Sequence, residues 1–114
     1  MNIVVQGTKE FSDYNVFMRA MGVALSGIKD EEFNVYSVGP AKINSFTAEF
    51  CNISKNSLRQ RGIKTKFYRV PQSFVEDRIN TVDYVVFLSN TNQKPSKLVS
   101  YAELSGVDVG LFRY

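Results

Sequence analysis

Short apolar runs alternate with longer amphipathic stretches along the whole chain. The runs have the length of strands, and those at 3–5 and 85–88 are continuously apolar, which is typical of parallel strands buried on both faces. The stretches between the runs repeat apolar residues at three- and four-residue spacing, as amphipathic helices do. The pattern predicts strands at residues 2–6, 33–38, 65–70, 83–88 and 107–112.

The amphipathic stretches predict three helices and one shorter helical turn. A polar residue can cap each helix start, namely Asp13 for the first, Asn44 or Ser45 for the second and Ser96 for the third. We expect the helices at residues 13–26, 44–61 and 96–105, and the turn around 73–80. The inner faces of the first two helices are expected to carry Tyr14, Phe17, Met18, Met21, Leu25, Phe46, Phe50, Ile53 and Leu58.

The alternation of strands and helices predicts a three-layer α/β sandwich, in which right-handed crossovers join about five parallel strands of a Rossmann-like sheet. The third predicted strand carries Lys66 and Arg69, and such charges favour an edge position. An edge position for the third strand agrees with the doubly wound order 3-2-1-4-5. At 114 residues, the chain is expected to form one domain, 1–114.

The composition excludes several classes of site. The chain has no histidine and one cysteine, Cys51, so a zinc site lacks its usual ligands, and Ser-His and Cys-His nucleophilic sites are ruled out. We expect Cys51 to pack as a small apolar residue. No apolar run approaches the ~18 residues of a membrane span, and no signal peptide is visible. These features favour a cytoplasmic protein without metal, cofactor or membrane partner.

In a doubly wound sheet, ligands bind beyond the carboxyl ends of the strands, where the strand order reverses. Residues 7–9, 39–44 and 89–97 fall on this edge, and their many donors suit a phosphorylated ligand, although polar loops and helix caps explain the same residues. Phe11 can either stack on a base or staple the helix start, and Arg78 can either reach the pocket or pair with Glu76 or Asp77. The candidate binding residues are Gly7, Thr8, Lys9, Phe11, Gly39, Lys42, Asn44, Arg78, Ser89, Asn90, Thr91, Asn92, Lys94 and Ser96.

A basic cluster follows the second predicted helix. With Phe67 and Tyr68 interleaved, it is a candidate nucleic-acid surface, and the net charge of +3 permits a polyanionic partner. A solvated face with a protected sheet edge is the more usual meaning of such charges. The cluster comprises Lys55, Arg59, Arg61, Lys64, Lys66 and Arg69.

Four motifs in order suggest a family. Residues 5–13 read VQGTKEFSD, 61–63 read RGI, 78–80 read RIN before DYVVF at 83–87, and 101–109 read YAELSGVDV. Their order and spacing resemble the SLOG superfamily, small Rossmann-like proteins that include the LOG-type nucleotide-binding proteins. The family's Gly-Gly-x-Gly-Thr phosphate loop is replaced at 89–97 by a segment without glycine, and its glycine-rich block before the second helix is reduced to 39–44.

The resemblance implies non-catalytic binding of a nucleotide or nucleotide-derived ligand. Small stand-alone members occur in phages, where holding a host signal or a host protein is a natural use. The alternative is a degenerate Rossmann-like scaffold used for protein–protein interaction. A phosphoribohydrolase-type enzyme ranks last, because Glu103 lacks the motif that would position it. Homodimers are common in the family, and the apolar helix faces are compatible with one.

Overall fold

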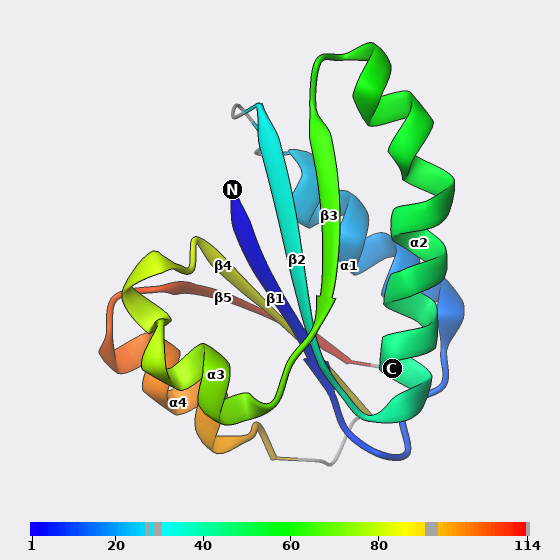
Figure 1. The fold of residues 1–114 in the computed structure, drawn as a ribbon. Coiled ribbons are helices and arrows are strands. Elements are labelled where there is room, and N and C mark those ends of the chain that lie inside the picture. Colours follow the sequence, from blue (N-terminus) through cyan, green and yellow to red (C-terminus); the bar gives the residue numbers. More distant parts are fainter. Residues whose placement is uncertain (27, 29–30, 91–93, 114) are drawn as a thin grey trace.

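The structure, a computed structural model, describes residues 1–26, 28, 31–90 and 94–113 and arranges them as one sheet with helices on both faces (Figure 1). In these residues the strands are β1 (Asn2–Gly7), β2 (Glu32–Gly39), β3 (Lys64–Arg69), β4 (Tyr84–Ser89) and β5 (Asp108–Arg113). The helices are α1 (Tyr14–Ser26), α2 (Ala41–Gln60), α3 (Gln72–Asp77) and α4 (Lys97–Leu104), with a 3-10 helix, η1 (Ile79–Thr81), after α3. The predicted strands and helices are therefore confirmed in type and order.

The five strands are parallel and lie in the order β3-β2-β1-β4-β5, as the sequence predicted. β1 is the central strand because Ile3, Val4 and Val5 give it apolar side chains on both faces, and all three are fully buried. β3 is an edge strand, with Lys66 and Arg69 exposed to solvent. The charges of β3 thus marked the edge correctly.

The larger core lies between the sheet and the helix pair α1 and α2. Ile3, Val5 and Phe33 of the sheet pack there with Phe17 of α1 and Ile43 of α2. Burial of these large side chains is the main force that holds the two long helices on this face.

The smaller core lies on the opposite face of the sheet. Val4 and Val85 pack there with Val75 of α3, Ile79 of η1 and Leu98 of α4. Because α3 has only six residues, the face of β2 and β3 on this side carries no helix along most of its length, as Figure 1 shows.

The second helix begins earlier than predicted. It starts at Ala41, directly after a cis Gly39–Pro40 peptide bond, and Pro40 rather than Asn44 or Ser45 occupies the N-cap position. The Asn44 N–H donates to the Pro40 carbonyl at 3.0 Å, which places Asn44 inside the first turn. Polar side chains are the preferred N-caps, so the sequence favoured Asn44 or Ser45 over Pro40.

The predicted inner faces were wrong at two positions. Ile53 of α2 is 60% exposed, and Met18 of α1 is 37% exposed. The buried positions include the smaller residues Cys51 in α2 and Ala20 and Ala24 in α1. Small side chains allow a helix to lie close to the sheet, and a count of large apolar residues does not detect them.

We expect Gly7→Ala to lower the free energy of unfolding by about 1–3 kcal/mol, because a new methyl group would overpack the core. A Cβ at position 7 would lie 2.7 Å from Cδ1 of Ile43 and 3.1 Å from the Leu88 carbonyl oxygen. Urea unfolding measures the change. Gly22→Ala is the matched control, since a Cβ at this position of α1 meets no atom within 4 Å and alanine favours the helix. Equal stabilities for the Gly7 variant and the wild type would contradict the close packing.

Candidate functional site

The carboxyl edge of the sheet gathers three loops and three helix starts. The segments after β1, β2 and β4 leave the sheet at this edge, because all the strands run in the same direction (Figure 1). α1, α2 and α4 begin in or after these segments. The strand order reverses between β1 and β4, so this edge is where an open α/β sheet usually binds a ligand.

A polar network lies at the end of β1. Gln6 is 9% exposed, and its Nε2 donates to Oε1 of Gln72 at 3.0 Å. Ser96 Oγ donates to Oε1 of Gln6 at 2.6 Å, and Gln72 Nε2 lies 3.5 Å from Oε2 of Glu76. The network joins β1 to α3 and to the start of α4. Ser96, predicted as a ligand donor and as a helix cap, therefore donates its hydroxyl to the protein itself.

Sequence reasoning missed Gln6 and Gln72 as members of this edge. The signal for Gln6 is a glutamine at the end of an otherwise apolar central strand, where a buried amide needs partners. Gln72 carries no such signal, because its neighbours in the sequence are those of an ordinary helix start. Only the fold brings its side chain to β1.

A second polar contact holds the start of α2. Ser37 of β2 is 1% exposed, and its Oγ donates to Oδ1 of Asn44 at 2.5 Å. Asn44 was predicted as a cap or a ligand donor, and the structure instead directs its carbonyl oxygen toward β2. Gly39, between them in the chain, has a φ of 103°, in the region that glycine adopts most readily.

Backbone hydrogen bonds hold the loop after β1, one of them to β4 and one within the loop. Thr8 N–H donates to the Leu88 carbonyl at 2.9 Å, and Phe11 N–H donates to the Thr8 carbonyl at 3.2 Å. Phe11 is fully buried in the larger core, so its predicted stacking on a base is wrong, and packing at the helix start is its role. Gly7 accommodates the close approach of the Ile43 side chain.

Arg78 lies apart from the other predicted site residues. Its guanidinium carbon is 3.8 Å from the centroid of the Phe74 ring, and its Nη1 donates to the Phe74 carbonyl at 3.3 Å. With Val4 and Tyr36 it lines a small hollow against the middle of the sheet. The predicted reach into the pocket is therefore wrong, because α3 ends over the sheet face and a cation–π contact holds the side chain there.

The remaining predicted residues divide by exposure. Ser89 is buried at the end of β4, whereas Lys9, Lys42 and Lys94 are exposed. Asn90 Nδ2 lies 3.5 Å from the Glu10 carbonyl oxygen, which joins the segments after β4 and β1. The predicted residues Thr91 and Asn92 lie outside the described residues.

The helix starts give the carboxyl edge a positive electrostatic character. α2 and α4 have no acidic residue in their first turns and no side-chain cap. The start of α1 differs, because the Asp13 carboxylate accepts a hydrogen bond from Val16 N–H at 2.9 Å and caps this helix, as the sequence predicted. Unpaired backbone N–H groups and the positive end of the helix dipole attract anions. Lys42 lies in the first turn of α2 and Lys97 in that of α4, and both are exposed. The arrangement can therefore attract an anionic group.

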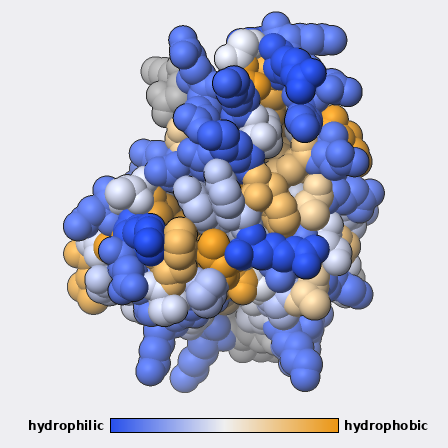
Figure 2. Space-filling model, in the orientation of Figure 1, coloured by the Kyte–Doolittle hydropathy of each residue, from blue (hydrophilic) through white to orange (hydrophobic). Residues whose placement is uncertain are grey.

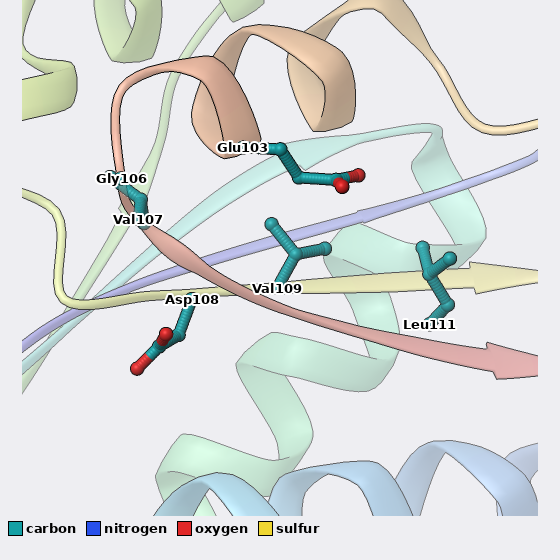
Figure 3. A pocket seen from close by; sticks show the side chains of 6 residues that line it. All are labelled: Glu103, Gly106, Val107, Asp108, Val109 and Leu111. Carbon is teal, nitrogen blue, oxygen red and sulfur yellow. The ribbon is translucent and has the colours of Figure 1, made fainter.

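A separate groove of about 380 Å³ lies at the free edge of β5. Figure 3 shows Glu103, on the last turn of α4, with its side chain above Val109, whereas Asp108 points to the other side of the strand. Glu103 is at the end of α4 opposite to Ser96, so it lies away from the carboxyl edge.

Two classes of site find no support in the described part of the chain. No group of three or more Cys, Asp or Glu side chains there is arranged to hold a metal ion. Among the same residues, no helix has both the length and the apolar character needed to cross a bilayer.

Comparisons with models of protein families, with curated proteins and with solved structures found no match. The resemblance to the SLOG superfamily therefore stays a prediction from the motifs.

We expect Cys51 to resist alkylation in the native protein. The side chain is 6% exposed, and burial raises the pKa of its thiol to about 11, so the reactive thiolate is scarce at pH 8. Iodoacetamide labelling followed by mass spectrometry should be slow in buffer and fast in urea. Above pH 8, the native labelling rate should keep rising toward pH 11. Labelling of the native protein at the rate found in urea would contradict this assignment.

Proposed function

We propose that the protein binds a nucleotide or nucleotide-derived ligand at the carboxyl edge of its sheet and does not turn it over. One observation carries the proposal: α2 and α4 both begin at this edge without acidic first-turn residues and without side-chain caps. A phosphate group is the natural partner of such helix starts, since it accepts hydrogen bonds from backbone N–H groups and complements the dipole.

The polar contacts at the edge support a rigid site. Gln6 is held by Gln72 and by Ser96, and Ser37 holds Asn44, so the starts of α2 and α4 are fixed to the ends of β2 and β1. A preformed site loses little entropy when a ligand binds. Lys42 and Lys97, one at each helix start, supply mobile charges that can reach a phosphate.

Turnover is not part of the proposal. A phosphoribohydrolase-type reaction would require a carboxylate beside the bound sugar, and the candidate Glu103 belongs to the far end of α4. The buried side chains at the edge are amides and hydroxyls, which position a ligand but are poor acids and bases at neutral pH.

A thermal-shift panel of mono-, di- and cyclic nucleotides, NAD and ADP-ribose tests the proposal. A ligand at about one hundred times its dissociation constant should stabilise the protein by roughly 2.7 kcal/mol and raise Tm by several degrees. Lys42→Glu should weaken the active ligand about tenfold, because it reverses a charge at the phosphate. Arg19→Glu, an exposed charge reversal within α1, should leave the affinity unchanged. A flat panel would reject the proposal.

A second candidate function, assembly through the β5 edge, rests on exposed apolar side chains. Leu104 is 88% exposed, Tyr101 41% and Leu111 44%, and all three belong to α4 or β5. β5 has a free edge, which can pair with another strand. A second copy of the chain paired through β5 would cover both features, and this is the scaffold alternative in its simplest form.

Sedimentation velocity tests this assembly. We expect a concentration-dependent dimer in which Leu104→Asp weakens association at least tenfold, since it places a charge in an apolar contact. Ile53→Asp is the control, because Ile53 is 60% exposed on α2, which packs over β2 and β3 at the other end of the sheet. A monomer at all concentrations, or equal effects of both variants, would exclude this interface.

A further inference from the structure

The positive charge of the chain is concentrated in one segment. Residues 50–75 contain no aspartate and no glutamate, and they contain the six cations of the basic cluster. The whole chain has a net charge of only +3, so the remainder is net negative. The fold brings this segment to one place, the end of α2 and the adjoining edge strand β3.

A basic cavity lies between the end of α2 and the start of β3. It has a volume of about 450 Å³ and is lined by four of the cations together with Ile63 and Thr65. Thr65 also lines a neighbouring cavity of about 230 Å³, and its buried Oγ1 has no hydrogen-bond partner among the described residues. Figure 2 shows strongly hydrophilic side chains over the end of α2 and the start of β3. The cations of the larger cavity are Lys55, Arg59, Lys64 and Lys66.

An aromatic surface lies beside the cations on the open face of β2 and β3. Tyr36 and Tyr68 are opposite each other in register, with ring centroids 5.1 Å apart and planes at 15°. Phe74 of α3 continues the row, 6.0 Å from Tyr36, and Arg78 covers its ring. Tyr68 is 40% exposed, and Figure 1 shows that α3 covers only one end of this face.

Successive side chains of β3 point to opposite faces of the sheet, so the two aromatic residues among the cations are separated. Phe67 packs against the larger core under α2, whereas Tyr68 points to the open face. Lys64 and Lys66 precede Tyr68 by four and two residues and therefore share its face. Lys66 Nζ is 2.8 Å from Oε1 of Glu32, so much of its charge is already neutralised. The uncompensated charge of the surface comes mainly from the other cations.

We propose that the open face of β2 and β3, together with the basic cavity, binds single-stranded nucleic acid. Tyr68 stacks on a base at the edge of the sheet, because Tyr36 covers one side of its ring and none of the described strands lies beyond β3 on the other. Lys55, Arg59 and Lys64 contact the phosphates. Rings flanked by cations are the common means of binding unpaired strands without sequence preference.

The geometry favours an unpaired strand over a duplex. Stacking on Tyr68 requires a base whose face is free, and the bases of a duplex are already stacked on one another. A duplex would be read by an element that enters a groove. Here the cations lie along a sheet edge and a helix end, on both sides of a β3 that is only six residues long.

Fluorescence anisotropy with labelled oligothymidylate and oligouridylate of about 12 nucleotides tests the proposal at low salt. Tyr68→Ala should weaken binding about tenfold or more, and Tyr68→Phe, which keeps the ring, should restore it. Tyr101→Ala is the matched control, because Tyr101 is 41% exposed on α4. It should bind as the wild type does. Thermal unfolding of each variant verifies that the fold is intact.

Salt dependence tests the phosphate contacts. The logarithm of the association constant decreases as the logarithm of the salt concentration rises. In Arg59→Ala and in Lys55→Ala, this slope should become less steep by about 0.7, the expected loss for one contact to a single strand. Arg19→Ala, which removes an exposed cation from α1, should leave the slope unchanged.

Three results would overturn the proposal. One is absence of binding to either oligonucleotide at low salt. Another is wild-type affinity for Tyr68→Ala in a folded protein, which would remove the stacking site. The third is equal affinity for a duplex of the same length, which would make the surface a general binder of polyanions.

Discussion

The burial of β1 on both faces is the constraint on which the other elements depend. Ile3, Val4 and Val5 have no exposed surface, so the sheet needs a helical layer on each side. Parallel strands then require crossover helices, which bring all three loops of the candidate site to one edge. The two layers are unequal, because α2 has 20 residues and α3 has six. The short α3 places Phe74 against Tyr36 but leaves Tyr68 exposed, so an exposed ring on β3 results from the same topology as the carboxyl edge.

Much of the fold could be predicted because its strongest signals are local. Continuous apolar runs identified β1 and β4 as central strands, and the charges of β3 identified the edge. The errors concern features that depend on tertiary packing. Ile53 fits a helical repeat as well as Cys51 does, and only the position of the sheet determines which of them is buried. Phe11 lies in a polar stretch of sequence, yet the turn after β1 inserts its ring into the core.

The position of the candidate site could be predicted from the sequence, but the contacts within it could not. Loop positions follow from strand order, so Lys42 and Ser96 were placed at the correct edge. Hydrogen-bond partners do not follow from strand order. Ser96 donates to Gln6 and Asn44 accepts from Ser37, contacts between residues that are 90 and seven positions apart in the chain. These contacts make the edge firmer, while the uncapped starts of α2 and α4 retain its attraction for anions.

The basic surface of β3 and α2 is explained only in part by the stability of the fold. Lysines on an edge strand discourage pairing with other sheets, and this protective role accounts for Lys64 and Lys66 without any ligand. It doesn't account for Tyr68, because an exposed ring on an edge strand favours the association that lysines discourage. The cations on α2 have no edge to protect, and a solvated helix face accounts for them without a ligand. Lys55 and Arg59 line the same cavity as the β3 lysines, so the proposed nucleic-acid partner would account for the tyrosine and both sets of cations together.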